Sequence, residues 1–294
     1  MLAVYKKELR SYFTSVIGYL FIGLLLLILS FLFYNINIIK KNAFIGYVFE
    51  HNYLQIVLMI LIPVMTMKIF ADERHSKTDQ MLFTAPVKIF SIVMGKFLAI
   101  ATMFTIPMLV FCFYPLVLSD YGTIPWLASY NSIFGFWLMG LSAIAIGVFI
   151  SSITENQIMS AVVTFVILLV SFACFYMNTS FPNNALASVI FFSVIAALLA
   201  LIVFAQLKSN VKIAIMCSGG FLAVCVIALV VIYFVKEAWL VGAIQSFLLK
   251  LSLYQNLSHF CVQYFDIVAV VYNVSIIVFC LFLTNQSLEK RRWN

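Results

Sequence analysis

The feature that most constrains this chain is a set of long segments without a charged side chain. Asp, Glu, Lys and Arg are absent between Arg10 and Lys40, Lys96 and Asp120, Asp120 and Glu155, Glu155 and Lys208, Lys212 and Lys236, and Asp266 and Glu289. A membrane-spanning helix needs about 20 apolar residues, so each segment can cross a bilayer. With 65% hydrophobic and 9% charged residues, the 294-residue chain cannot cover itself with polar surface. A water-soluble domain and a disordered chain are therefore excluded.

These segments, together with the apolar stretch at 53–70, predict an all-α, polytopic membrane protein with eight spans in a single transmembrane domain, residues 1–294. The longest segment, from Glu155 to Lys208, is broken by turn-forming residues at 178–184, which predicts a helical hairpin. Helices are favoured over a β-barrel because the runs are continuously apolar rather than alternating. The predicted spans cover residues 14–36, 53–70, 92–118, 131–152, 157–177, 185–206, 213–235 and 267–285.

The basic residues predict the orientation. With eight spans both termini share one side, and 13 of the 17 Lys and Arg residues flank the spans there, against four on the other side. The positive-inside rule therefore places both termini in the cytoplasm of a multi-pass cell-membrane protein. The net charge of +7 contains no dense basic run away from the membrane edges, so a nucleic-acid partner is disfavoured.

Two further segments are predicted to be helical without crossing. Residues 2–13 place apolar side chains near one side and Lys6, Lys7 and Arg10 elsewhere, which is typical of a helix that lies along the lipid surface. Residues 237–266 contain an amphipathic stretch expected to dip into the outer interface; a short extra span or a plain loop is the alternative.

The span centres indicate where the energy for transport would come from. They hold no Asp, Glu, Lys, Arg or His, whereas ion-driven carriers need such groups at bilayer depth. The six cysteines form no Cys-x-x-Cys pair, so no metal site is predicted. The chain also lacks the Gly-x4-Gly-Lys-Ser/Thr loop that binds nucleotide phosphates. An ATPase, if one is involved, is a separate polypeptide.

Four segments carry a resemblance to a known family. They are VYKKELRSYFTSVIGYLF near the N-terminus, FADERHSKTDQMLFTAPV followed by IVMGKFLA, AIGVFISSITENQIMSAVVTF, and the closing LSHF and VYNVSIIVFCLFLTNQSLEKRRW. In this order they resemble the ABC type-2 permeases, in particular the branch of gliding-motility and nitrous-oxide-cluster permeases. The resemblance covers residues 1–177 and 257–293, and residues 185–236 are an additional hairpin relative to the common six-span plan.

The resemblance implies an ATP-driven exporter in which this chain is the non-enzymatic permease. Its partners would be a cytoplasmic ABC ATPase, which binds ATP and Mg, and a second permease copy or a sister permease, all within membrane lipid. No catalytic residue is expected in this chain. The implied contacts are a coupling helix in the 71–86 loop (Glu73, Arg74, Thr78, Leu82, Thr84, Pro86), an N-terminal interface helix (Tyr5, Lys6, Lys7, Glu8, Arg10), a second cytoplasmic turn (Thr154, Glu155, Asn156) and an outer gate-like segment (His259, Phe260, Asp266).

Three alternatives stay open from the residues alone. The 68–97 segment could be an ordinary solvated loop with positive-inside charge. The protein could be a gradient-driven carrier or channel, with Asn131 and Asn273 as the nearest candidate polar groups. It could also be a membrane enzyme built around His259 and Asp266. Peptides, lipids and glycans all stay open as substrates.

Overall fold

The computed structural model describes residues 1–76, 88–206, 233, 240–261 and 265–293, and every regular element in these ranges is a helix. The chain divides into two compact units. Unit 1 comprises Met1–Phe172 and Leu253–Asn294, and unit 2 comprises Ala173–Ser252.

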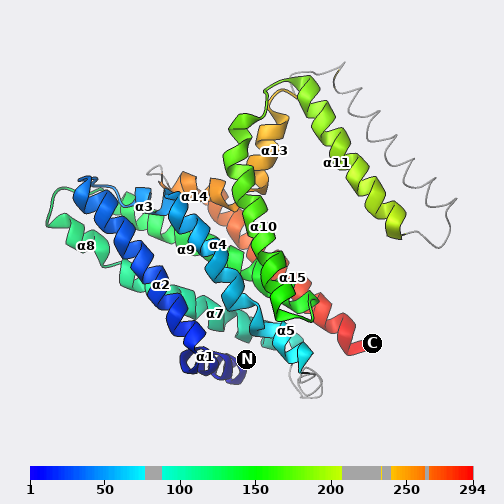
Figure 1. The fold of residues 1–294 in the computed structure, drawn as a ribbon. Helices are drawn as coiled ribbons and strands as arrows, with labels where there is room; N and C mark the ends of the chain where they lie inside the picture. Colours follow the sequence, from blue (N-terminus) through cyan, green and yellow to red (C-terminus); the bar gives the residue numbers. More distant parts are fainter. Residues whose placement is uncertain (77–87, 207–232, 234–239, 262–264, 294) are drawn as a thin grey trace. The chain divides into compact units, whose positions relative to one another are not determined.

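Unit 1 is a helical bundle whose two chain ends lie at the same end (Figure 1). The short helices α3, α8 and α14 lie at the opposite end. Its elements are α1 (Leu2–Thr14), α2 (Val16–Phe33), the π-helix η1 (Tyr34–Ile39), α3 (Gly46–Glu50), α4 (Asn52–Thr66), α5 (Lys68–His75), α7 (Ile89–Phe111), α8 (Tyr114–Ser119), α9 (Trp126–Ile153), the first part of α10 (Gln157–Met177), α14 (Leu253–Cys261) and α15 (Ile267–Trp293).

Helix α9 forms the core of unit 1. It packs against α15, α14, α7, α4 and α5, and most of its residues are buried. Small residues permit this close packing: a Cβ on Gly147 would lie 2.4 Å from Thr66 Oγ1 of α4. A polar contact joins α9 to the last span, where Ser142 Oγ donates to Asn273 Oδ1 at 3.0 Å. Serine and asparagine therefore serve here as contacts between helices.

Unit 2 contains the end of α10, a 3-10 turn (η2, Asn178–Ser180), α11 (Ala185–Gln206) and α13 (Ala243–Leu251). Cys174, Ile244 and Leu248 form a small buried cluster, and Phe181 and Phe191 pack against it. Two side chains tie the loops to the helices. Ser188 Oγ donates to Leu240 O at 2.6 Å, and Gln245 Nε2 donates to Phe181 O at 3.0 Å.

The described residues contain six helices that are long and apolar enough to cross a membrane. They are Val16–Ile39, Asn52–His75, Ile89–Ser119, Trp126–Ile153, Gln157–Ser180 and Ile267–Arg292, and each overlaps a predicted span. The predicted span 185–206 coincides with helix α11, of which Ala185–Leu198 is a shorter apolar helix. The predicted span 213–235 lies outside the described residues except for position 233. Large apolar side chains such as Leu27 and Phe31 are exposed on α2, as expected for a surface that faces lipid.

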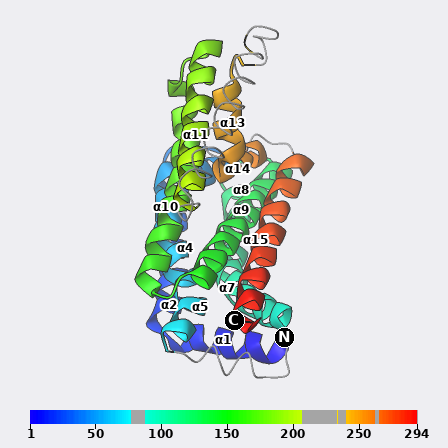
Figure 2. The ribbon, with the colours of Figure 1, turned by 90° about the vertical axis from the view of Figure 1, so that its right-hand side faces the viewer.

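The two segments predicted to be helical without crossing both contain helices. The predicted helix 2–13 is α1, which lies across one end of the bundle in Figure 2. The predicted amphipathic segment 237–266 contains α13 and α14, joined through Ser252. The 71–86 loop begins with α5 as far as His75, and residues 77–86 lie outside the described residues.

Candidate functional site

The end of unit 1 that carries both termini brings together most of the segments that the resemblance assigns to ATP coupling. Helix α1 packs along the start of α7, and α5 packs against the end of α9. The end of α15 joins the turn between α9 and α10, where Arg291 Nη2 lies 3.6 Å from Glu155 Oε1. A site for transmitting force would need such convergence.

Helix α5 follows α4 at Met67, whose backbone stays right-handed helical (φ −57°, ψ −35°), and a serine on another helix bonds to the first turn of α5. Ser151 Oγ of α9 accepts hydrogen bonds from the backbone N–H groups of Phe70 (3.1 Å) and Ala71 (3.2 Å). The same hydroxyl donates to Met67 O at 3.2 Å. Since the first N–H groups of a helix lack partners within it, Ser151 acts as a cap supplied from outside. It fixes the start of α5 on α9.

A buried lysine joins α7, α5 and α1. Lys96, with 1% of its side chain exposed, places Nζ 2.7 Å from Glu73 Oε2 of α5 and 3.5 Å from Glu8 Oε1 of α1. Nζ also donates to Ile69 O at 2.5 Å and lies 4.8 Å from the centre of the Phe70 ring. We call Lys96, Glu73, Glu8 and Lys7 the charge cluster; Lys7 lies at its exposed edge, 3.9 Å from Glu73 and 4.0 Å from Glu8.

The charge cluster is electrically balanced, with two lysines and two glutamates. The Glu73 and Glu8 side chains are only 18% and 14% exposed. Burying an ion is costly unless opposite charge and hydrogen bonds compensate it, so the largely buried Lys96, Glu73 and Glu8 require one another. The contacts therefore hold α1, α5 and α7 as one body.

Helix α1 is also attached by neutral contacts. Tyr12 OH donates to Met65 O at 3.0 Å, and Tyr5 OH lies 3.1 Å from Thr102 Oγ1. Burial, and to a lesser degree the negative charge of Glu8, raises the pKa of the Tyr12 hydroxyl, so it remains a neutral donor. Gly95 allows the close approach of α1, because a Cβ there would lie 3.1 Å from Met1 O.

The opposite side of α5 contacts the α9–α10 turn, which is the predicted second cytoplasmic turn. Arg74 is buried, and its Nη1 donates to Thr154 O at 3.0 Å. Asp72 Oδ1 accepts a hydrogen bond from Gln157 Nε2 at the start of α10. Glu73 and Arg74 thus engage opposite neighbours inside unit 1, α7 with α1 on one side and the α9–α10 turn on the other.

The other predicted site residues fall into three groups. Lys6 and Arg10 of α1 are exposed, and Asn156 Oδ1 accepts the N–H of Ile158 at the start of α10. Thr78, Leu82, Thr84 and Pro86 lie outside the described residues. The predicted gate residues lie at the other end of unit 1 and are treated separately.

The structure brings the three gate residues together on α14 and at the start of α15. His259 Nδ1 is 3.9 Å from Asp266 Oδ2, and Asp266 Oδ1 caps α15 by accepting the N–H of Val268 at 2.8 Å. Phe260 is fully buried, and its carbonyl accepts from Asn131 Nδ2 and Ser132 Oγ of α9, both at 3.3 Å. These contacts attach the segment to α9. Within the described residues no cluster of three His, Cys, Asp or Glu side chains could hold a metal.

The sequence does not predict the roles of two important residues, Lys96 and Ser151. In the sequence, Lys96 serves only as one of the basic residues that predict the orientation, although it falls inside the predicted span 92–118. A lone ionisable residue inside a span is itself a signal for a buried partner. Ser151 gave no comparable signal, because a serine that caps its own helix and one that caps another look the same in sequence.

The comparison with protein-family models decides the family. Residues 39–232, more than half of the 294-residue chain, match the model of the ABC-2 family transporter protein. The chain belongs to the ABC-2 transporter family. The matched region of this ABC-2 transporter includes Glu73, Arg74, Lys96 and α9, whereas α1 and α15 lie outside it. Comparison with curated proteins and with solved structures gives no match. Membership together with the six long apolar helices establishes a membrane-embedded protein of a family whose membrane subunit is normally non-enzymatic.

A pair of adjacent serines tests the capping contact in this ABC-2 transporter. Ser151→Ala is expected to lower the free energy of unfolding by about 2 kcal/mol, because the start of α5 loses its external acceptor. Ser152 is equally buried, but its hydroxyl donates only to Phe149 O of its own helix, at 2.7 Å. Ser152→Ala should therefore change stability by less than about 1 kcal/mol. Thermal unfolding of the purified variants in detergent measures both, and equal losses would contradict the capping role.

Proposed function

We propose that this ABC-2 transporter is the permease subunit of an ATP-driven exporter. It would lie in the cell membrane with eight spans and both termini in the cytoplasm, and pair with a second copy or a sister permease. The observation that carries the proposal is the convergence of α1, α5 and the α9–α10 turn at one end of unit 1. A separate cytoplasmic ATPase would bind ATP and Mg. The resemblance further suggests the branch of gliding-motility and nitrous-oxide-cluster permeases.

The contacts of α5 suggest how force would travel. An ATPase that moves the loop after His75 would pull directly on α5. Glu73 would pass the displacement to Lys96 in α7 and to α1, and Arg74 would pass it to the end of α9. In this scheme Glu73 and Arg74 transmit force within the permease. Direct contact with the ATPase is assigned to Thr78, Leu82, Thr84 and Pro86.

The packing of two asparagines weighs against a gradient-driven carrier. Asn273 Nδ2 donates to Ala269 O at 2.9 Å, and its Oδ1 accepts from Ser142. Asn131 Nδ2 donates to Phe260 O. Both side chains therefore take part in helix packing, which offers no reason to assign them to an ion path. The proposed contact with an ATPase can be tested directly by cross-linking.

A photo-reactive amino acid at position 82 is expected to cross-link this chain to a cytoplasmic ABC ATPase. The physical reason is that Leu82 lies in the segment proposed to seat against that subunit. The permease carrying the label is expressed with its native partners and irradiated, and the cross-linked product is identified by mass spectrometry.

The matched control places the same label at position 123, in the loop between α8 and α9 at the opposite end of unit 1. No ATPase adduct is expected from Thr123. Cross-linking to the ATPase from position 123 but not from 82 would reverse the proposed orientation. An absence of ATPase adducts from 82, with ion-driven transport in vesicles that lack any ATPase, would favour the carrier.

A further inference from the structure

Helix α14, at the end of unit 1 opposite the termini, is fixed to the core of the unit by neutral contacts. It packs against α9, α3 and α15. The ring of Phe260 occupies the space left by Gly135 of α9, where a Cβ would lie 2.4 Å from that ring. Leu253 N donates to Ser171 Oγ of α10 at 2.9 Å. Since α9 and α10 contain no Asp, Glu, Lys, Arg or His, these contacts do not depend on pH.

The contact between α14 and α3 contains a carboxylate without a counter-charge. Glu50, the last residue of α3, is half-buried and forms no ion pair with any described residue. Burial, and to a lesser degree the negative charge of Glu50, raises the pKa of the Cys261 thiol on α14 to about 12, so the thiol supplies no charge. Burial disfavours the ionised carboxylate and therefore raises the pKa of Glu50 itself.

The contact between α14 and α15 depends on a histidine. His259 Nδ1 lies 3.9 Å from Asp266 Oδ2, and the Gln255 amide lies 3.1 Å from the other ring nitrogen. The two side chains form an ion pair only while the imidazole is protonated, and histidine changes charge between about pH 5 and pH 8. The amide of Gln255 suits both forms, because it can donate to the neutral ring and, turned over, accept from the protonated ring.

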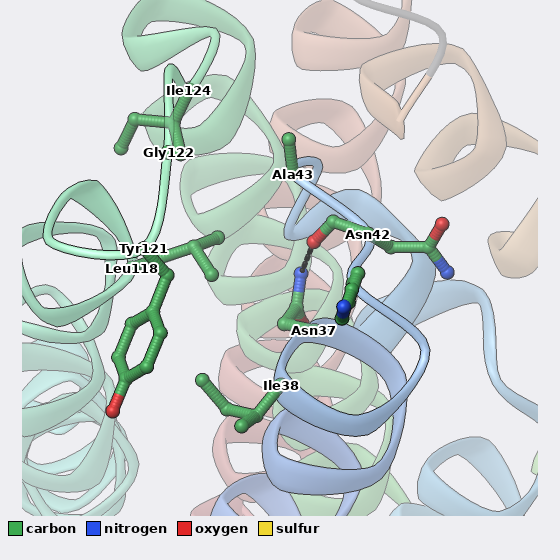
Figure 3. A pocket seen from close by; sticks show the side chains of 9 residues that line it. Asn37, Ile38, Asn42, Ala43, Leu118, Tyr121, Gly122 and Ile124 are labelled. Carbon is green, nitrogen blue, oxygen red and sulfur yellow. Dashed lines mark hydrogen bonds between the residues drawn. The ribbon is translucent and has the colours of Figure 1, made fainter.

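The other charged side chains at this end of unit 1 have different surroundings. Lys41 lines a cavity of about 410 Å³ between residues 37–43 and residues 118–124, several of which Figure 3 labels. It forms no ion pair with Glu50 or with any other described residue. Lys40 and Asp120 are exposed. None of these three charges therefore compensates Glu50.

His51 follows Glu50 directly but is a poor counter-ion for it. The His51 ring packs on the Tyr53 ring, with 5.0 Å between the centres. His51 Nδ1 is buried and has no hydrogen-bond partner among the residues that the structure describes. A proton on that nitrogen would be left unpaired, which is costly in a buried position. Glu50, His259 and Asp266 are therefore the groups through which pH acts on α14.

Both titratable contacts gain stability as the pH falls. A packed state in which a carboxyl group has a raised pKa binds its proton more tightly than the open state does, so acid favours the packing of α3 on α14. This contribution is complete below the pKa of an exposed glutamate and is lost as the pH rises through the raised value of Glu50. Protonation of His259 adds an attraction to Asp266 and acts in the same direction.

We propose that α14 is an acid-stabilised clamp that holds α3 and α15 firmly at low pH and releases them as the pH rises. Its contact with α9 persists at every pH, so only the two flanks of the helix respond. The clamp does not depend on the ATPase coupling proposed above, because every residue in it lies at the other end of unit 1. In the proposed orientation this end faces the outside, and the clamp responds to external pH.

The test measures amide hydrogen exchange in the full-length permease, reconstituted in lipid nanodiscs, by mass spectrometry at about pH 5 and pH 8. After correction for the intrinsic effect of pH, exchange reports local opening. Protection of α14 is expected to be about fivefold higher at the lower pH, the upper end for a half-exposed ion pair. Glu50→Gln imitates the protonated carboxyl group and should raise protection at the higher pH. His259→Gln should lower protection at the lower pH, and the double variant should show no pH dependence.

Asp120→Asn and His75→Gln are the matched controls, because each removes an exposed titratable side chain that lies outside α3, α14 and α15. Both should keep the pH profile of the unmodified protein. Protection of α9 is the internal standard for folding and should be equal at the two pH values in every variant. Protection of α14 that fails to rise at the lower pH overturns the proposal. A double variant that retains the pH profile of the unmodified protein overturns it as well.

Discussion

Replacing Lys96 with methionine is expected to lower the free energy of unfolding by about 3–5 kcal/mol, because Glu73 and Glu8 would lose their buried counter-charge. Methionine preserves the length of the side chain but supplies neither the charge nor the bond to Ile69 O. The attachment of α1 and α5 to α7 should weaken at the same time. Chemical unfolding of the detergent-purified protein measures the stability. If the proposed ATP-driven function holds, the ATP-coupled transport rate measures the attachment of α1 and α5 to α7.

Two companion variants make the Lys96 prediction specific to the charge cluster. Adding Glu73→Gln to Lys96→Met should restore part of the lost stability, because it removes one of the two uncompensated carboxylates. Lys88→Met removes an exposed lysine just before α7 and should change stability by less than about 0.5 kcal/mol. If the two single changes, Lys96→Met and Glu73→Gln, simply added in the double variant, the ion pair would not contribute to the fold.

A second large effect is expected from Gly147→Leu in the core of unit 1. A Cβ at this position already lies 2.4 Å from Thr66 Oγ1 and 2.9 Å from Thr66 Cβ, so the larger side chain must push α9 away from α4. Overpacking of this kind costs about 3 kcal/mol or prevents assembly. Gly23→Leu is the control, because a Cβ on Gly23 meets no atom within 4 Å. For both variants, the yield of monodisperse protein measures assembly and the unfolding temperature measures stability. A Gly147→Leu protein with the yield and unfolding temperature of the unmodified protein would contradict the close packing of α9 on α4.

Much of the fold could be predicted from the distribution of charge. The runs without charged residues identify five of the six candidate spans, because ions are excluded from hydrocarbon wherever the chain crosses it. The sixth, Asn52–His75, ends in the charged residues of α5 and lies outside these runs. The turn at 178–184 and the helix at 2–13 follow from equally local signals. Membership in the ABC-2 transporter family agrees with the resemblance carried by four short segments.

The candidate site was less accessible to prediction, because its contacts join residues distant in sequence. Glu73 and Arg74 lie in a charged stretch of the sequence, which favours either a coupling helix that contacts an ATPase or an ordinary solvated loop. In the structure Glu73 meets Lys96, and Arg74 meets the carbonyl of Thr154, 80 positions away. The sequence pattern cannot distinguish a charged side chain that contacts a separate ATPase from one that lies inside the helical bundle. The assignment of Thr78, Leu82, Thr84 and Pro86 to an ATPase stays a prediction.

The pairing of α9 with α15 has a consequence for how the protein is made. Helix α15 leaves the ribosome only after all of Ala173–Ser252 has been synthesised, yet it covers a long face of α9 and bonds to it through Ser142 and Asn273. During that interval the nascent chain must keep this face of α9 within the insertion machinery or against lipid. A nonsense mutation before Ile267 would therefore leave an orphaned helix surface of the kind that membrane quality-control proteases remove.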